Sequence, residues 1–167
     1  MSTHQIGGFT ARLAPALPLS VQTSGYASGD LIGTLLTFSL GPDNPAQRGA
    51  TGTIHSVQLF DAGATKANVT VVLFDRMPAV TPFTDGSALD IADGDGGAIF
   101  ATVSLTQYTD FNDSAFGAVV GLGRPFQCAP GANSLWAAVM ADASATFAAA
   151  GDLRLSLGAF LDQREPA

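Results

Sequence analysis

Hydrophobic and polar residues alternate along much of the chain with the two-residue period of β-strands. The clearest examples cover residues 68–75 and 99–105. In the first segment one side is wholly apolar and the other is only half polar, which predicts a central strand covered on both faces rather than an edge strand facing water. A long loop rich in Asp and Gly, residues 81–97, separates the two strands.

The same pattern predicts further strands on either side of this pair. They cover residues 17–23, 31–38, 51–60, 115–122, 134–140 and 152–160, and a short additional piece ends at Cys128. Gly33 is expected to mark a bulge or a close contact, residues 108–114 are expected to be a polar connection, and the Ala-rich residues 141–150 fit either a loop or a helical turn.

The ends of the chain depart from this pattern. Residues 1–16 show neither hydrophobic period and are expected to form an extended N-terminal arm, and the polar residues 162–167 a frayed tail. The eight or nine expected strands have irregular spacing and loops of unequal length. This predicts an all-β fold over residues 17–161, a two-sheet antiparallel jelly-roll sandwich, rather than an up-and-down barrel.

Composition supports a single soluble domain. The chain has 167 residues, enough for one core, and its lone cysteine excludes an internal disulfide. The net charge of −7, with scattered basic residues, argues against a nucleic-acid partner. No apolar run is long enough to span a membrane, and the first residues lack the pattern of a signal peptide. Hydrophobic residues make up 47% of the chain, which favours a subunit interface.

One group of carboxylates could in principle hold a cation. It comprises Asp85, Asp90, Asp93 and Asp95. Calcium favours several oxygen ligands from such a loop, but the twelfth position counted from Asp93 is Ser104, where an EF-hand needs glutamate. The favoured interpretation is a short helical turn over residues 87–93, with Asp side chains satisfying turn amides. We therefore expect no metal site and no cofactor.

Candidate catalytic residues are few. His4 and His55 are the only imidazoles, and His55 lies within a predicted strand that has no nucleophile elbow or Gly-rich oxyanion loop. A structural or surface role is favoured for it, and Cys128 is expected to be a small buried hydrophobe rather than a nucleophile. No catalytic residue is therefore predicted, and the protein is not expected to be an enzyme.

Three aromatic residues could stack on sugars, because β-sandwiches often carry such faces. They are Tyr26, Tyr108 and Trp136. Trp136 lies between Leu135 and Ala137 in an apolar strand, which favours a role in the core or in an interface.

Three segments carry a resemblance to known proteins. They are residues 26–33, which begin Tyr-Ala-Ser-Gly-Asp, residues 71–75, Val-Val-Leu-Phe-Asp, and residues 78–93, whose most specific part reads Phe-Thr-Asp-Gly-Ser-Ala-Leu-Asp-Ile-Ala-Asp. Together they resemble the capsid decoration, or cement, proteins of tailed bacteriophages, which have a jelly-roll fold. The resemblance covers residues 21–105, rests on scaffold residues and carries over no active site.

The resemblance implies a structural virion protein, assembled in the host cytoplasm, that docks on the exterior of a phage head. It would do so as a homotrimer at a three-fold position, bracing neighbouring major capsid protein subunits. Residues 1–13 lack both hydrophobic periods and are rich in glycine and small polar residues, so we expect them to serve docking rather than folding. Two other classes stay open. A carbohydrate-binding module of a head fibre or host-attachment component needs exposed aromatics on one face, and a small hydrolase needs His55 beside a nucleophile and an acid.

Overall fold

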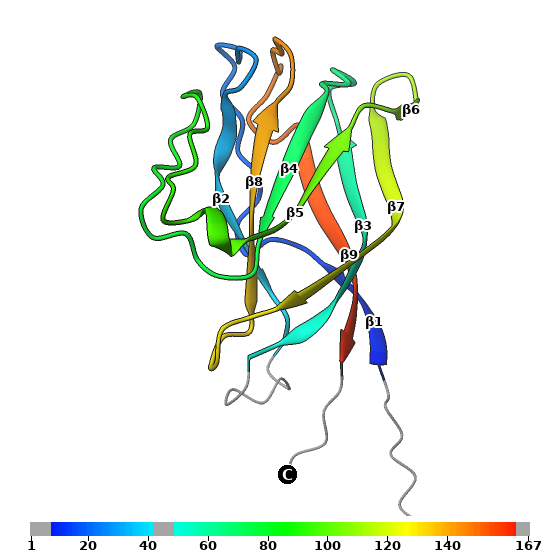
Figure 1. Cartoon of the computed structure of the whole chain (residues 1–167). Coiled ribbons are helices and arrows are strands. Elements are labelled where there is room, and N and C mark those ends of the chain that lie inside the picture. Colours follow the sequence, from blue (N-terminus) through cyan, green and yellow to red (C-terminus); the bar gives the residue numbers. More distant parts are fainter. Residues whose placement is uncertain (1–7, 42–48, 163–167) are drawn as a thin grey trace, which may run out of the picture.

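The computed structural model describes residues 8–41 and 49–162, and the strands within them form two antiparallel sheets packed face to face (Figure 1). The five-stranded sheet has the order β1 (Gly8–Leu13), β9 (Leu153–Asp162), β3 (Thr51–Asp61), β7 (Ala115–Gln127) and β6 (Tyr108–Asp110). The four-stranded sheet has the order β2 (Leu31–Ser39), β8 (Ser134–Ala141), β4 (Val69–Phe74) and β5 (Ile99–Leu105).

The strand order is that of a jelly roll. The first strand, β1, pairs with the last, β9, and the second, β2, pairs with β8. Further inward, β3 lies between β9 and β7, and β4 lies between β8 and β5. Early strands therefore pair with late ones, in a nested manner, and alternate between the two sheets. The predicted two-sheet jelly-roll sandwich is confirmed.

The main core lies between the two sheets and is built from alternate residues of each strand. In β9 these are Leu153, Leu155, Leu157, Ala159 and Leu161, all of which are buried. Burying one leucine side chain stabilises a fold by roughly 2 kcal/mol, so this one strand makes a large contribution.

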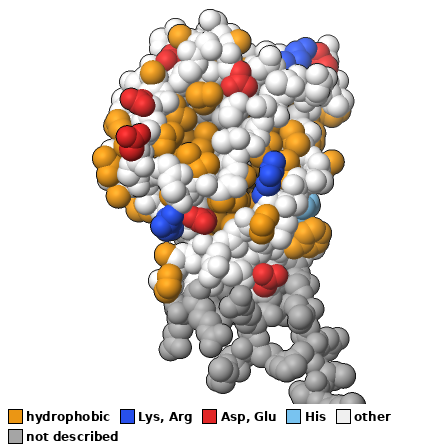
Figure 2. Space-filling view, viewed as in Figure 1, with side chains coloured by type: hydrophobic (Ala, Val, Ile, Leu, Met, Phe, Trp, Pro, Cys, Tyr) orange, Lys and Arg blue, Asp and Glu red, His pale blue; other side chains and the backbone are white. Residues whose placement is uncertain are grey.

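A second, smaller core lies on the outer side of the four-stranded sheet. Val72 and Phe74 point away from the main core, yet both are buried. They are covered by residues 76–98, here called the strap, from which Phe83, Leu89 and Ile91 pack against them. In Figure 2 hydrophobic side chains gather on this side of the molecule. The prediction that β4 is covered on both faces is confirmed.

The prediction of an extended N-terminal arm is wrong for residues 8–13. These residues form β1, which pairs with β9, and Leu13 is buried in the main core. The alternation of Ala11 and Leu13 with Thr10 and Arg12 is the signal, but it is too short to stand out without its partner strand. The prediction is also wrong for Pro15 and Ala16, which pair with Phe38 and Thr37 of β2. Residues 1–7 and 163–167, which include the start of the arm and most of the tail, lie outside the described residues.

Four other expectations differ from the structure. Residues 17–23 contain no strand, although Leu19 and Val21 are buried. Residues 108–110 form β6, and residues 115–127 form the single strand β7 instead of two pieces. Residues 87–93 are not helical, and the strap instead contains the short 3-10 helix η1 (Gly96–Ala98). Residues 141–150 contain no helix, which agrees with the loop alternative. In the described part of the chain no helix is long and apolar enough to cross a membrane.

Candidate functional site

The strap is fastened to the edge of the four-stranded sheet by one carboxylate and several backbone hydrogen bonds. Asp85 Oδ1 accepts hydrogen bonds from the hydroxyl of Tyr26 at 2.8 Å and from the amide of Gly33 at 2.7 Å. The backbone amide of Leu31 donates to Ser87, and that of Gly86 donates to Leu31. The strap therefore continues the sheet beyond β2 over a short distance, and it is held there at residues far apart in sequence.

Two glycines make this close approach possible. Gly33 has a φ of 73°, and a Cβ atom there would lie 2.7 Å from Leu19 Cδ1. Gly86 has a φ of 72°, and a Cβ atom there would lie 2.2 Å from Gln22 Nε2. Both positions lie in the left-handed region that disfavours other residues. The register of β2 also shifts near Gly33, so the expected bulge and close contact are confirmed.

A second carboxylate, Asp95, organises the first half of the strap from within. It is buried, and it accepts hydrogen bonds from the backbone amides of Ala79 at 2.8 Å, Val80 at 2.9 Å and Thr81 at 2.6 Å. The Thr81 hydroxyl adds a fourth at 2.7 Å. These donors hold the pKa of Asp95 well below its usual range. One side chain thus fixes the backbone of three successive residues.

The carboxylates considered as a calcium site do not come together. Asp85 and Asp95 are engaged as described, and Asp90 and Asp93 are exposed. Within residues 8–41 and 49–162 no group of three or more His, Cys, Asp or Glu side chains could hold a metal ion. The interpretation that these side chains accept hydrogen bonds from turn amides is confirmed for Asp95, which binds the amide of Ala79 among others. It is also confirmed for Asp85, which binds the amide of Gly33.

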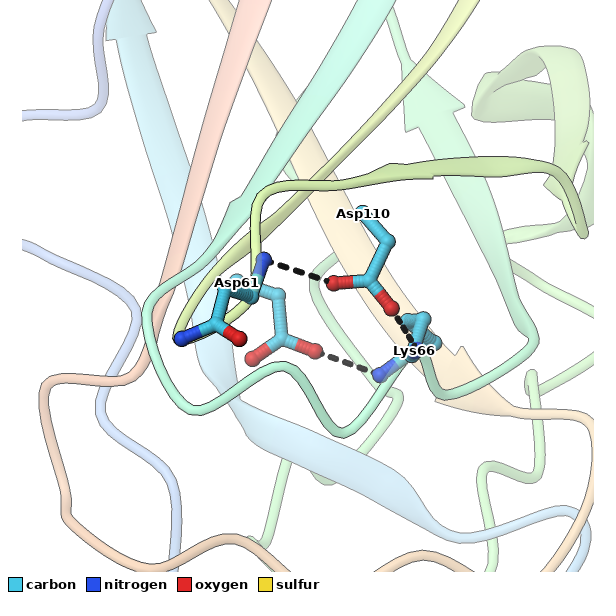
Figure 3. A network of polar contacts seen from close by, with 4 residues as sticks. Asp61, Lys66 and Asp110 are labelled. Carbon is cyan, nitrogen blue, oxygen red and sulfur yellow. Dashed lines mark hydrogen bonds and ion pairs between the residues drawn. The ribbon is translucent and has the colours of Figure 1, made fainter.

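A polar network at the loop end of the sandwich was not anticipated from the sequence (Figure 3). Asp61 is fully buried at the end of β3 and accepts hydrogen bonds from the amides of Gly63 at 3.1 Å and Lys66 at 2.6 Å. The Lys66 ammonium forms an ion pair with Asp110, which also accepts the amide of Asn112 at 3.0 Å. The network joins the β3–β4 loop to β6, so it is a structural clamp. The only indication of this clamp in the sequence is Asp61 followed by Ala-Gly-Ala, which is typical of a turn.

His55 lies on the outer face of the five-stranded sheet at a bulge in β3. Its ring stacks on that of Phe160, with ring centroids 4.7 Å apart, and lies over Gly158, where a Cβ atom would be 2.8 Å from His55 Nε2. In the described part of the chain no hydrogen bond joins His55 to a carboxylate, and Ser56 Oγ accepts from Gln58 Nε2 at 3.4 Å. His55 therefore occupies a packing position, and the arrangement does not resemble a catalytic triad. His4 lies outside the described residues.

Cys128 is buried, as expected. Its thiol donates a hydrogen bond to the carbonyl of Ser134 at 3.2 Å, and burial raises the pKa of the thiol to about 11. A thiol in this state is a poor nucleophile.

The aromatic residues considered as sugar platforms are engaged in the fold. Tyr26 is buried, with its hydroxyl on Asp85. Tyr108 donates a hydrogen bond to the carbonyl of Ala67, and Trp136 packs partly buried against the second core. The favoured interpretation of Trp136 was a role in the core or in an interface, and its packing against the second core agrees with the first of these. These three side chains do not form an exposed row.

The outer face of the five-stranded sheet was missed by the sequence reasoning. Val120 and Phe160 are exposed there, and Phe60, Phe116 and Ala118 lie beside them at register positions of β3 and β7. None of the described segments covers this face as the strap covers the opposite side. The signal is present in β7, where Phe116, Ala118 and Val120 alternate with smaller or inward-facing residues.

Comparison with known proteins gives limited information. No protein-family model and no curated protein sequence matches the chain. Among solved structures, a chain of tomato aspermy virus is 12% identical with a TM-score of 0.38, and the match covers 100% of this chain and 83% of that one. A chain of desmodium yellow mottle tymovirus is 10% identical with a TM-score of 0.32, covering 100% of this chain and 93% of that one. Both TM-scores are too low to bear on function.

Proposed function

We propose that this protein is a structural component of a virus particle, namely a capsid decoration protein. In this role it binds the exterior of a phage head and stabilises the contacts between major capsid protein subunits. One observation supports the proposal most directly. The separate segments that resemble decoration proteins meet in one substructure, in which Tyr26 and Gly33 from one segment both donate to Asp85 from another.

The contact between these segments supports the proposal because the residues that carry the resemblance lie far apart in the sequence. Tyr26 and Asp85 are 59 positions apart, and the segment of residues 71–75 supplies the strand on which the strap packs. The residues of the resemblance together hold the strap on the four-stranded sheet, and a motif made of scaffold residues is expected to have such a structural role. A coincidental match of sequence letters would scatter them over the fold.

The surface properties fit an exterior position. A net charge of −7 opposes contact with packaged nucleic acid, since like charges repel. Only 13% of the residues are charged, against about a quarter in typical domains, so much of the surface is uncharged and suited to protein contacts. Residues 8–13 belong to the five-stranded sheet, so they are not free to serve as a docking arm. In this proposal the protein attaches to the phage head through the surface of the sandwich and through residues 1–7.

The expected action is stabilisation by mass action. A protein that binds the assembled shell but not free subunits shifts the equilibrium toward the shell. A homotrimer at a three-fold position would contact three capsid subunits at once, and its closed symmetry would prevent growth into filaments. This oligomeric state remains part of the proposal.

The test is binding to assembled heads. Purified protein is mixed with heads of the phage that encodes it and, as a control, with unassembled major capsid protein, and each mixture is sedimented. We expect saturable co-sedimentation with heads alone and a higher temperature of head disassembly. Protein that stays in the supernatant with heads would refute the proposal, and glycan-dependent binding to host cells without head binding would favour the carbohydrate-binding alternative.

A further inference from the structure

The two outer faces of the sandwich differ in a way that the proposed function does not explain. The strap covers the outer face of the four-stranded sheet with a small core of its own. The outer face of the five-stranded sheet, here called the open face, carries no such cover among the described residues. Its apolar side chains are Phe60, Phe116, Ala118, Val120 and Phe160.

The centre of the open face is uncharged and preorganised. Val120 is 71% exposed and Phe160 is 47% exposed, and with Phe60, Phe116 and Ala118 they place five apolar side chains on one face of the sheet. Between their strands, Ser56 and Ser156 are buried, and Gln58 bridges them with hydrogen bonds of 3.4 Å to each. The side chains of Ser56, Gln58 and Ser156 thus satisfy one another, so a partner could cover this part of the face without leaving these three groups unpaired.

The open face is large enough for a specific interface. Neighbouring strands lie about 4.8 Å apart and rise about 3.3 Å per residue, so five strands of these lengths make a surface on the order of 700 Å². A stable protein interface buries roughly 800 Å² on each partner. The open face is therefore comparable in area with one side of a protein interface, and in a ring its two halves would contact two different neighbours, with the adjoining rim adding to each contact.

Charge is arranged asymmetrically across the open face. Arg154, Phe60, Phe116 and Thr109 are successive register partners in β9, β3, β7 and β6, so they form one row across the sheet. The guanidinium of Arg154 lies 5.9 Å from the centre of the Phe60 ring at one end of this row. Asp113, which is exposed, lies just beyond the other end, in the turn that joins β6 to β7. Asp110 is not part of this face, because it pairs with Ala115 in register and with Lys66 as an ion pair. One end of the row therefore carries Arg154 and the other lies next to Asp113.

We propose that the open face is the contact between copies of this chain. The β1–β9 side of one copy, with Arg154, receives the β6–β7 edge of the next copy, with Asp113, and the contact buries Val120 and Phe160. A rotation axis parallel to the strands keeps each residue at the same level along the strands, so it can bring Arg154 of each copy to Asp113 of its neighbour. Repeated with a rotation of a third of a turn between copies, this heterologous contact closes into a ring of three. The inference specifies the interface of the homotrimer in the proposed function and rests on that part of it.

The first test uses two matched valines. Val120 on the open face is 71% exposed and Val80 on the strap is 68% exposed, so aspartate should be equally compatible with folding at either position. Light scattering coupled to size exclusion is expected to give three times 17.0 kDa for the wild type and for Val80→Asp, and 17.0 kDa for Val120→Asp. Phe160→Asp provides a second variant, and circular dichroism checks that each variant is folded.

A charge exchange tests the proposed pairing itself. Arg154→Asp and Asp113→Arg should each weaken self-association at least about tenfold at low salt, because each places like charges in contact. The double variant should regain most of the loss. A monomeric wild type, an unchanged mass in Val120→Asp or Phe160→Asp, dissociation by Val80→Asp as well, or a double variant no better than either single one would overturn the inference. Head binding is measured separately, so a ring that forms but does not bind heads would count against the proposed function alone.

Discussion

The hydroxyl of Tyr26 donates a hydrogen bond of 2.8 Å to Asp85 Oδ1 and accepts one of 2.7 Å from the amide of Gln22. Tyr26 thereby links the segment before β2 to the strap on the other side of that strand. Burial, with Asp85 as hydrogen-bond acceptor, raises the pKa of the phenol to about 12, so the group stays protonated and able to donate throughout the physiological range.

Replacing Tyr26 with phenylalanine should loosen the strap while leaving the sandwich intact. The change removes the donor to a carboxylate and leaves the Gln22 amide without its acceptor, which should cost about 1–2 kcal/mol of unfolding free energy. Urea denaturation measures this loss, and limited proteolysis should show faster cleavage within residues 76–98. Tyr108→Phe is a useful control, because its hydroxyl bonds to Ala67 instead. Equal protection of the strap in wild type and Tyr26→Phe would contradict the assignment.

Asp95 should make the strap sensitive to acid. Because the pKa of its carboxyl is depressed in the folded state, the stability it contributes is present above the usual carboxyl pKa near 4 and is lost as the pH falls below that value. We expect Asp95→Asn to lower the melting temperature by several degrees at pH 7. The difference in melting temperature between the variant and the wild type should become smaller at pH 2–3. The exposed Asp93→Asn serves as the control. A gap that does not shrink in acid would show that another group is responsible.

Asp75 is expected to destabilise the protein at neutral pH. Its Oδ1 atom is buried and has no hydrogen-bond partner among the described residues, although Arg76 Nε lies 3.6 Å away as an ion-pair partner. Burial outweighs the attraction of Arg76 and raises the pKa of the carboxyl. A raised pKa means that protonation favours the fold, and this advantage disappears as the pH rises through the folded-state value. Asp75→Asn should therefore stabilise the protein by up to about 1 kcal/mol at pH 7. The gain should vanish near pH 3, and a gain of equal size at both pH values would contradict the explanation.

Cys128 should be inert until the protein unfolds. With the pKa of the thiol at about 11 and the side chain buried, thiolate is scarce at pH 8. Alkylation by iodoacetamide should be at least about a hundredfold slower than for an exposed cysteine in a peptide. In urea the rates should become equal. Rapid modification of the native protein would mean that the region around Ser134 opens readily.

Chelation of divalent cations should leave stability unchanged. The strap carboxylates are already occupied by amide donors or lie apart at the surface, so a bound cation has no ligand set there. Melting curves with EDTA and with added calcium should superimpose. A fall in melting temperature that calcium reverses would reveal a site built differently from the one considered in the sequence.

The sequence was informative wherever a strand alternates strongly by itself. Residues 153–159 alternate between apolar residues and polar or small ones, and residues 69–74 form an apolar run rich in valine that suits a strand covered on both faces; β9 and β4 appear there as expected. β1 was missed because Leu13 is buried only through its pairing with β9, a contact that single-sequence patterns do not encode. The same holds for β6, whose three residues form a strand only beside β7.

The roles of the carboxylates were harder to anticipate than the strands. Asp85 and Asp95 are seen to bind amides only once the fold brings Gly33 and Ala79 to them. Asp61 gave no signal beyond a turn sequence, yet it is the most completely buried carboxylate of the described network in Figure 3. Burial and partner choice are long-range properties, so composition and spacing could indicate turn-binding aspartates without saying which amides they bind.

The pairing of β1 with β9 also has a consequence for the timing of folding. β9 lies between β1 and β3, so the five-stranded sheet cannot close until its last strand is available, with Gly8 opposite Asp162. During synthesis the earlier strands must wait with their apolar sides unpaired, and contacts so distant in sequence form slowly. A ribosome-bound chain lacking β9 should therefore be protease-sensitive and dependent on chaperones, and release of the final strand should convert it to the resistant form within seconds.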